Sequence, residues 1–257
     1  MHSSFFDLPR RVAVAGDWHG DAQWAVKMIH VAAEQGATHL VHLGDFGYRF
    51  SVSFLDALQR ALDECGIILG FVDGNHEDFS WLNAQAFAAD GTRHLRERII
   101  HLPRGLRWTW GDLSLLALGG AHSVDRQSRV PGASWWPEET ITLRQAHEVT
   151  TGGHADVMFT HDVPAGVPVE GLAPPGTFPA AEIRTADQHR ELLRQVTDVV
   201  RPSALWHGHY HARYDAWLHG ADYRTRVRGM SRDNDSTRAN MMVVSVADLA
   251  AESLSEG

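Results

Sequence analysis

The sequence predicts an α/β fold, with a mainly parallel β-sheet whose faces are covered by helices. In the N-terminal third, short apolar segments alternate with longer amphipathic segments, which is the pattern of successive strand–helix–strand units. Beyond about residue 95, closely spaced strand-like segments separated by turn residues predict a more β-rich region. The 257 residues are enough to bury a sizeable core, and no segment has the composition of a linker. We therefore expect one domain over residues 1–257.

Three strands and two helices are predicted in the N-terminal third. The strands are short apolar runs over residues 11–15, 39–43 and 67–72. The helices cover residues 21–35 and 52–64, because their apolar side chains recur every three or four positions. Gly36 is placed to end the first helix, and Ser51 is placed to cap the amino end of the second.

The rest of the chain combines further strands with two helices and two long loops. Strands are predicted over residues 98–101, 106–110, 113–118, 155–159, 204–207, 213–218, 223–228 and 241–246. One helix is predicted over about residues 137–149, and another over residues 186–200. Loops are predicted over residues 119–137 and 163–180, with a turn over residues 233–236.

The composition is that of an ordinary globular protein, with 44% apolar and 21% charged residues. No apolar run approaches the roughly 20 residues that a membrane span needs, and we expect neither a signal peptide nor a membrane partner. Cys65 is the only cysteine, so an internal disulfide is impossible and a reducing, cytoplasmic compartment is expected. The formal net charge of −9 disfavours loose binding to long nucleic acids, although bound metal ions would reverse the charge locally.

Five short polar blocks each follow directly on a predicted strand. They are Gly16–Gly20 (GDWHG), Gly44–Asp45 (GD), Gly74–Glu77 (GNHE), Thr160–Asp162 (THD) and Gly208–His211 (GHYH). Because ligands of α/β sheets bind beyond the carboxyl ends of the strands, we expect the five blocks to converge at one edge of the sheet. Residues two apart on an extended segment point roughly the same way, so Asp17 and His19 can face one cleft, as can His209 and His211.

The side chains in these blocks suit a pair of divalent metal ions. Carboxylates, imidazoles and one amide oxygen suit Mn, Fe, Zn, Co or Ni, and they do not resemble the all-oxygen site that Ca prefers. The blocks contain no thiolate, which argues against a structural zinc site. The candidate ligands are Asp17, His19, Asp45, Asn75, His161, His209 and His211.

The order Asp-x-His, Gly-Asp, Gly-Asn-His-Glu, His, Gly-His-x-His resembles that of the calcineurin-like metallophosphoesterase superfamily. The resemblance runs from residue 16 to residue 211 and implies a four-layer αββα sandwich with two mixed β-sheets. It also implies two divalent ions, for which manganese is our first expectation. The first ion would be held by Asp17, His19 and His211, the second by Asn75, His161 and His209, and both by Asp45. His76 matches the catalytic histidine of the family that is not a metal ligand.

The expected activity is phosphoester hydrolysis. Two metal ions roughly 4 Å apart can share a water, lower its pKa to give hydroxide, and neutralise charge on the phosphoryl group. His76, as an imidazolium, could give a proton to the leaving alkoxide. We expect the substrate to be a small phosphodiester, from a nucleotide or a short nucleic acid.

Two other functions compete with this interpretation. A phosphomonoesterase is the first alternative, but the protein phosphatases of the superfamily carry Asp-Arg-Gly after their second block, where Gly44–Tyr48 reads GDFGY. A non-catalytic scaffold is less favoured, because His76 and every expected ligand are present. The GNHE block and the HDVP stretch from His161 resemble the RNA lariat-debranching branch, which points to phosphodiesters. That branch has Cys where this chain has Asp17.

The loop over residues 119–137 is the expected wall of the site. Arg126 and Arg129 could grip a second phosphate or a leaving group, or they could be solvent-exposed loop charges. Trp135, with Trp136, could form an aromatic wall for a base or sugar, or a hydrophobic plug over the sheet.

Overall fold

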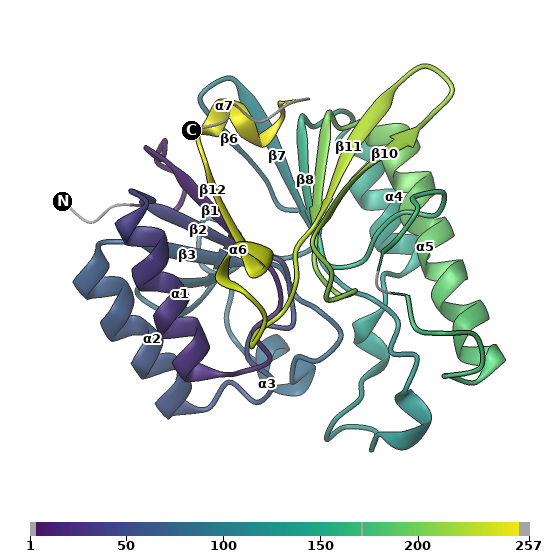
Figure 1. The fold of residues 1–257 in the computed structure, drawn as a ribbon, viewed down its shortest axis with the longest axis horizontal. Coiled ribbons are helices and arrows are strands. Elements are labelled where there is room, and N and C mark those ends of the chain that lie inside the picture. The colour runs from purple at the N-terminus through teal and green to yellow at the C-terminus, as the bar shows by residue number, and fades with distance from the viewer. Residues whose placement is uncertain (1–3, 171, 252–257) are drawn as a thin grey trace.

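Two six-stranded sheets face each other at the centre of the computed structural model, which describes residues 4–170 and 172–251 (Figure 1). Helices α1 (Ala22–Glu34) and α2 (Val52–Cys65) cover the outer face of the first sheet. Helices α4 (Leu143–Thr151) and α5 (Ala180–Val200) cover the outer face of the second. This arrangement confirms the predicted αββα sandwich with two mixed sheets.

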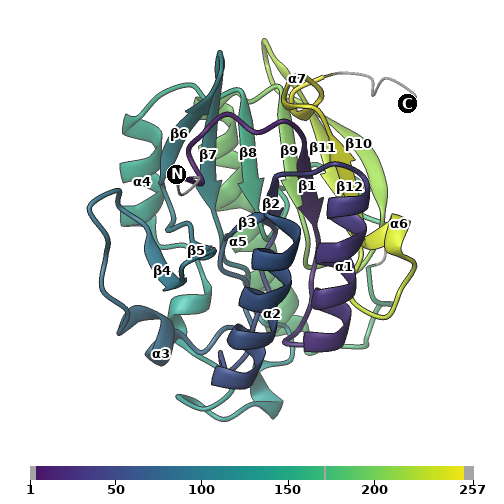
Figure 2. The same cartoon turned by 90° about the vertical axis from the view of Figure 1, so that its left-hand side faces the viewer.

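The first sheet has four parallel strands at its centre and an antiparallel strand at each edge. Its order is β12 (Met241–Val244), β1 (Val12–Ala15), β2 (His39–His42), β3 (Ile68–Phe71), β5 (Ile99–His101) and β4 (Arg93–Arg96). Helix α1 connects β1 to β2, and α2 connects β2 to β3, as expected for successive parallel strands. Figure 2 shows α1 and α2 side by side in front of this sheet.

The second sheet repeats this layout, with parallel strands inside and antiparallel strands outside. Its order is β10 (Tyr214–His219), β11 (Arg224–Gly229), β9 (Ala204–His207), β8 (Val157–Thr160), β7 (Leu113–Leu118) and β6 (Arg107–Trp110). The strand β8 is parallel to both β7 and β9. The central strands of both sheets therefore bring several carboxyl ends to one edge of the sandwich.

The hydrophobic core is divided into three layers by the two sheets. On β1, Ala13 and Ala15 pack towards α1 and α2, whereas Val12 and Val14 pack between the sheets. Alternate side chains of a strand point to opposite faces, and both faces are covered here. This is why the central strands are continuous apolar runs in the sequence rather than alternating patterns.

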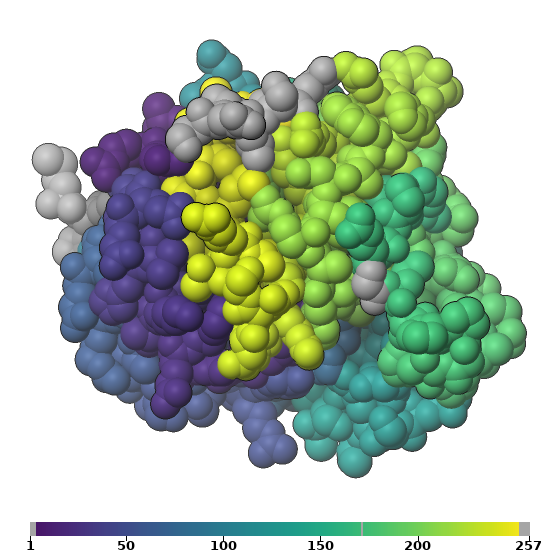
Figure 3. Space-filling model, viewed as in Figure 1, coloured from purple at the N-terminus to yellow at the C-terminus, as the bar shows by residue number. Residues whose placement is uncertain are grey.

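Short elements complete the structure. They are the helices α3 (Phe79–Asn83), α6 (Thr237–Asn240) and α7 (Val246–Leu249), and the 3₁₀ turns Arg126–Ser128 and Pro137–Glu139. After β11 the chain returns through α6 to β12, at the edge of the first sheet. Figure 3 shows this C-terminal part, in yellow, lying between the purple N-terminal part and the green part of the chain. Among the described residues, no helix combines the length and apolar character needed to cross a bilayer.

Every strand predicted from the sequence is present, with ends that differ by at most two residues. The helices α1 and α2 also confirm their predictions, and Ser51 caps α2 by accepting the Phe54 N–H at 3.3 Å. The turn at residues 233–236 is observed as well. The loop over residues 163–180 has no helix or strand before Ala180 in its described part, which omits position 171. The expected domain limits of 1 and 257 lie outside the described residues.

Three predicted elements need correction, and two observed elements were not predicted. The helix predicted over residues 186–200 begins six residues earlier, at Ala180, where only Ile183 supplies a large apolar side chain to the periodic pattern. The predicted strand 241–246 ends at Val244, because Ser245 caps α7. The strand β4 and helix α3 were not predicted, since both are short and mix polar with apolar residues.

The third correction concerns the helix predicted over residues 137–149, which is interrupted. A 3₁₀ turn ends at Glu139, and α4 begins only at Leu143. Thr142 explains the break, because it is extended and its hydroxyl accepts the Gln145 N–H at 3.2 Å. The Gln145 side chain accepts the Thr142 N–H at 3.0 Å in return, which completes a capping box that starts a new helix.

Replacing Thr142 by Ala should lower the free energy of unfolding by about 1 kcal/mol, because the amide groups at the start of α4 lose their cap. Urea denaturation of both proteins would measure the difference. Thr151→Ala, at the exposed end of the same helix, is the matched control and should have little effect. Equal stabilities of Thr142→Ala and the parent protein would contradict the assigned helix start.

Candidate metal centre

The five motif blocks meet where strands of both sheets end. The blocks that begin at Gly16, Gly44 and Gly74 follow β1, β2 and β3 of the first sheet. The blocks that begin at Thr160 and Gly208 lie at the ends of β8 and β9 of the second. The predicted convergence is therefore found, and the site straddles the seam between the two sheets.

Asp45 lies at the middle of this site and is fully buried. Its Oδ1 accepts the backbone N–H groups of Asn75 and His76, each at 2.9 Å, and lies 3.3 Å from His161 Nε2. Its Oδ2 lies 3.6 Å from His19 Nε2. The two oxygens of one carboxylate thus face histidines from the two expected ligand sets, as a bridging ligand must.

The ligands expected for the first ion form one cluster. Asp17 Oδ2 lies 3.2 Å from His211 Nε2 and 4.0 Å from His19 Nε2. One ligand atom from each of these three residues lies within 4.8 Å of the others. Asp17 also accepts the backbone N–H of His209 at 3.1 Å, which ties the first block to the last.

The ligands expected for the second ion lie beside the first cluster. His161 Nε2 is 3.0 Å from Asn75 Oδ1, and the rings of His161 and His209 have centroids 5.0 Å apart. Asp17, Asp45 and His161 also offer three atoms within 4.8 Å of one another. All seven candidate ligands are therefore brought together, and their division between two ions stays a prediction.

The charges in this cluster fit divalent cations. Burial favours a protonated Asp45, but His161, His76 and His19 together outweigh it and hold the pKa of Asp45 well below its usual range. Burial favours a neutral His161, but Asp45 and Asp17, with Glu77, together outweigh it and raise the pKa of His161 to about 10. Two buried carboxylates, Asp17 and Asp45, concentrate negative charge among oxygen and nitrogen donors, which suits ions such as Mn or Zn.

Backbone strain is concentrated at the ligands. Left-handed backbone conformations are found at His19 (φ 47°), Asp45 (φ 52°), His209 (φ 68°) and His211 (φ 54°). Non-glycine residues adopt this region at a cost, and such residues cluster at ligand sites. Gly44 has a φ of 95°, and a Cβ there would overlap the His161 ring. The blocks are therefore shaped to direct side chains inward rather than to minimise local strain.

Hydrogen bonds orient two of the candidate imidazole ligands. His161 Nδ1 lies 2.7 Å from the Leu43 carbonyl oxygen, and His19 Nδ1 lies 2.6 Å from Asp233 Oδ1. Each contact leaves Nε2 facing the cluster, as expected for a histidine that binds metal. Asp233 belongs to the turn at residues 233–236, and nothing in the sequence pattern links that turn to His19.

A second orienting chain acts on Asn75. Its Nδ2 donates to Ser123 Oγ at 3.0 Å, and the Ser123 hydroxyl donates to Glu139 Oε2 at 2.5 Å. All three side chains are buried. Because the amide NH₂ is directed to Ser123, the amide oxygen is left facing the cluster, where it can be a ligand. Sequence reasoning missed Ser123 and Glu139, since neither lies in a motif block.

Glu77 connects the two ligand loops of the first sheet. Its carboxyl oxygens accept the Phe46 N–H at 2.7 Å and the Gly74 N–H at 3.0 Å. Burial, together with the charge of Asp45, raises the pKa of Glu77 to about 8. The last residue of the GNHE block therefore fixes the loop of Asp45 against the loop of Asn75, and it is not among the ligands.

His76 lies at the mouth of the cluster beside Arg129. Its Nε2 is 3.8 Å from Asp45 Oδ2, and the two ring nitrogens lie 2.7 and 2.8 Å from guanidinium nitrogens of Arg129. Burial lowers the pKa of His76, and Arg129 acts in the same direction. Arg129 is itself held by Asp125, with Nε 2.8 Å from Oδ1. An unprotonated His76 nitrogen is therefore the acceptor of an Arg129 N–H.

Two pockets adjoin at His76, Asp125 and Arg129. One, of about 620 Å³, extends from His19 past Tyr48 and Arg49 to Trp136. The other, of about 370 Å³, extends from Asn75 and His209 to helix α5. The metal cluster thus opens into two separate spaces, with the Asp125–Arg129 pair between them.

Two other expected wall residues, Arg126 and Trp135, lie outside both pockets. Arg126 Nε pairs with Glu182 Oε2 at 2.8 Å, and its guanidinium lies 5.6 Å from the centre of the Trp135 ring. Trp136, rather than Trp135, lines the larger pocket, where its indole donates to Ser80 Oγ at 2.8 Å. The substrate roles predicted for Arg126 and Trp135 stay predictions.

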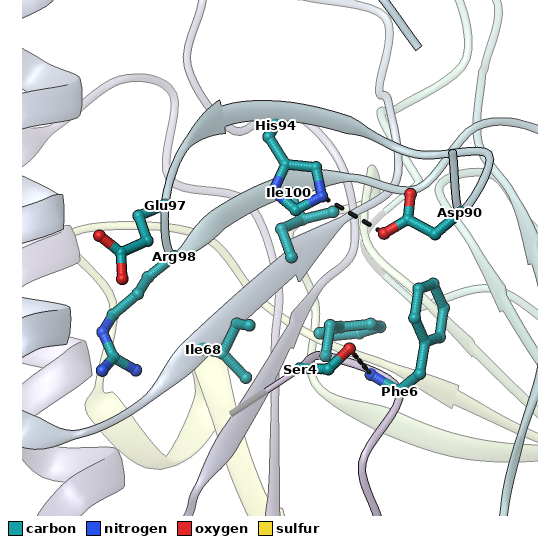
Figure 4. Close-up of a pocket in the computed structure, with 9 residues that line it drawn as sticks. Ser4, Phe6, Ile68, Asp90, His94, Glu97, Arg98 and Ile100 are labelled. Atoms are coloured by element: carbon teal, nitrogen blue, oxygen red, sulfur yellow. Dashed lines mark hydrogen bonds and ion pairs between the residues drawn. The ribbon is translucent and has the colours of Figure 1, made fainter. Parts of the chain in front are cut away.

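A further pocket, of about 290 Å³, lies at the edge strand β4 of the first sheet (Figure 4). Its wall includes the pair of His94 Nε2 and Asp90 Oδ2, 3.4 Å apart, with Ser4 and Phe6 across from them. This pocket contains none of the seven candidate ligands and is separate from the metal cluster.

Comparisons with known proteins agree with this geometry. The family model described as calcineurin-like phosphoesterase matches residues 10–213, which include all seven candidate ligands and His76. No curated protein sequence matches the chain significantly. A crystal structure of TT1561 from Thermus thermophilus is 14% identical and covers 93% of this chain and 99% of its own, with a TM-score of 0.54. A crystal structure of a dimetal phosphatase from Danio rerio is 13% identical, also with a TM-score of 0.54. The match covers 92% of this chain and 93% of the Danio rerio chain. These two structures share the fold.

Ser123→Ala should weaken manganese binding at the Asn75 side about tenfold or more, because the Asn75 amide is no longer held with its oxygen inward. Isothermal titration would resolve the affinities of the ions. Ser123→Thr keeps the hydroxyl and should restore binding, and Ser128→Ala, on the same loop but exposed, is the control. Unchanged affinities in Ser123→Ala would show that Ser123 does not orient Asn75.

Proposed function

This chain belongs to the calcineurin-like phosphoesterase family, and we propose that it is a dinuclear phosphodiesterase with manganese as its preferred metal. As a member of that family it hydrolyses phosphoric esters. We propose that its substrate is a small phosphodiester from a nucleotide or a short nucleic acid. We also propose a cytoplasmic location, because Cys65 is the only cysteine and leaves no internal disulfide.

The observation that carries the diester proposal is the pair of pockets that adjoin at His76 and Arg129. A phosphoryl group placed at Asp45 would lie beside both of them. A phosphodiester has two ester arms, and each pocket offers room for one. A phosphomonoester has a single arm and would use only one of the two spaces.

Seven residues of this chain would hold the two ions, with Asp17, His19 and His211 on one side and Asn75, His161 and His209 on the other. Asp45 would contact both ions through its two oxygens, which already face different histidines. When bound, the ions supply positive charge that stabilises the phosphoryl group in the transition state and acidify a water nucleophile.

Arg129 and His76 would act on the substrate directly. Arg129 can exchange its contact with His76 for a phosphoryl oxygen, because the guanidinium fork matches phosphate geometry. That exchange frees a His76 nitrogen at the mouth of the site. The freed His76 nitrogen would take up a proton from solvent and give it to the leaving oxygen, so that the ring returns to its neutral form.

A phosphomonoesterase is the second candidate, because the Danio rerio structure that shares this fold is a dimetal phosphatase. A phosphodiesterase would bind the second ester arm in the second pocket, whereas a phosphomonoesterase would leave that pocket without an ester arm. They can be separated by substrates that differ only in the second ester arm.

The manganese-loaded protein should hydrolyse bis-p-nitrophenyl phosphate with a kcat/KM at least about tenfold above that for p-nitrophenyl phosphate. Release of p-nitrophenol would be followed by absorbance, and chelation should abolish both reactions. A preference for the monoester would favour the phosphatase, and no hydrolysis with any of Mn, Fe, Zn, Co or Ni would refute the proposal.

The variant His76→Ala tests the same proposal with an unactivated leaving group. Turnover of a dinucleotide should fall by about a hundredfold, because its alkoxide needs a proton, whereas p-nitrophenolate leaves without one. Manganese stoichiometry should not change. His147→Ala, an exposed histidine on α4, is the control. Full dinucleotide activity in His76→Ala would exclude the proton role.

A further inference from the structure

One face of helix α5 forms a wall of the smaller pocket. Ile183, Ala186, Asp187 and Arg190 recur at the spacing that places side chains on a single helical face, and all of them line the pocket. On the other side of the same space lie the candidate ligands Asn75 and His209. A group attached to a phosphate at the metal cluster would therefore lie against α5.

This wall exposes large apolar side chains beside a highly charged site. Leu172 is 58% exposed and Ile183 is 41% exposed, and Phe178 lies with them. Folding alone gives no reason to gather such residues at the mouth of a cluster of carboxylates and imidazoles. Exposed apolar side chains that line a pocket are typical of a surface that contacts the apolar part of a ligand.

The wall is fixed in position relative to the metal cluster. Glu182, next to Ile183, is buried, and its Oε2 lies 2.9 Å from His122 Nε2 and 2.8 Å from Arg126 Nε. These contacts join the start of α5 to the loop that carries Arg129. The apolar wall and the phosphate-facing arginine therefore belong to one connected unit.

The cations of this pocket already have partners within the protein. Arg190 donates to the carbonyl oxygens of Val163 and Val167, each at 3.3 Å. Arg129 is paired with Asp125 and is the candidate contact for the reacting phosphate. Arg190 is held by these two carbonyl oxygens, and Asp187 adds a negative charge to the same wall, so the α5 side disfavours a second phosphate.

We propose that the pocket between the metal cluster and α5 binds an uncharged, apolar ester group of the substrate, about the size of one aromatic ring. The inference deepens the proposed function and rests on it. The second ester arm would point into the larger pocket, where Tyr48, Arg49 and Trp136 lie. The preferred substrate would then be a nucleotide diester whose other arm is apolar, and Leu172, Phe178 and Ile183 would determine that preference.

Binding of phosphonates to the manganese-loaded protein tests this without turnover. Phenylphosphonate should bind about tenfold more tightly than methylphosphonate, because the phenyl ring loses part of its water-exposed surface against the wall. Isothermal titration would give the ratio of the two dissociation constants. Hexylphosphonate, which carries an aliphatic chain of six carbons, distinguishes a preference for an aromatic ring from a preference for any apolar group. Tighter binding of phenyl than hexyl supports an aromatic arm, and equal binding supports an apolar arm of either kind.

The double variant Leu172→Ala with Ile183→Ala should reduce the phenyl-to-methyl ratio to about threefold or less, since both side chains lose most of their apolar surface. Both residues are exposed, so folding should be retained, which a thermal melt would check. Val199→Ala is the matched control, because Val199 is on the same helix and 50% exposed but lies outside the pocket. It should keep the full ratio.

A ratio near one in the parent protein, or a ratio that the double variant leaves unchanged, would overturn the inference. Hydrolysis of bis-p-nitrophenyl phosphate by the same preparations tests the proposed diesterase activity separately from the apolar pocket. Diester hydrolysis without the predicted ratio would refute the apolar pocket and leave the proposed function standing. The predicted ratio without hydrolysis of any diester would refute the proposed function and support the apolar site.

Discussion

The carboxylate of Asp45 is the group on which the rest of the site depends. It is a buried anion, and such a group is tolerated only when it is fully hydrogen-bonded and paired with positive charge. The N–H groups of Asn75 and His76 satisfy one oxygen, and this contact joins the loops after β2 and β3. Histidines from both sheets surround the remaining positions. Two divalent ions would supply positive charge at these positions and would bind the unprotonated imidazole nitrogens, which would balance the buried carboxylates.

The division of the fold into two sheets explains why the ligands extend from residue 17 to residue 211. Neither sheet alone supplies a complete ligand set, because Asp17, Asp45 and Asn75 come from one and the later histidines come from the other. The seam between the sheets is also where the loop with Arg129 and the start of α5 can form walls. The same arrangement that gathers the metals therefore leaves two spaces beside them, and the proposals on diester arms and on the apolar group both follow from that shape.

The sequence was sufficient to predict the central strands and the blocks, since each ligand lies at a strand end and its chemistry is visible in the residue type. It was not sufficient for the groups that orient the ligands. Ser123 and Asp233 reach Asn75 and His19 only through tertiary contacts, which leave no periodic or motif signal. The helix boundary at Thr142 was encoded locally, because Gln145 follows at capping-box spacing, and the pattern of apolar residues concealed it. The sequence also could not distinguish Trp135 from Trp136, because the conformation of the folded loop determines which of the two lines a pocket.

The most direct test of the account is a crystal structure of the protein soaked in manganese, with anomalous diffraction recorded at a wavelength where manganese scatters strongly. A dinuclear site should give two anomalous peaks, about 3.5–4 Å apart, with one oxygen of Asp45 beside each. One peak should contact Asp17, His19 and His211, and the other Asn75, His161 and His209. A single peak, or two peaks that do not share Asp45, would contradict the dinuclear site on which the proposed chemistry rests.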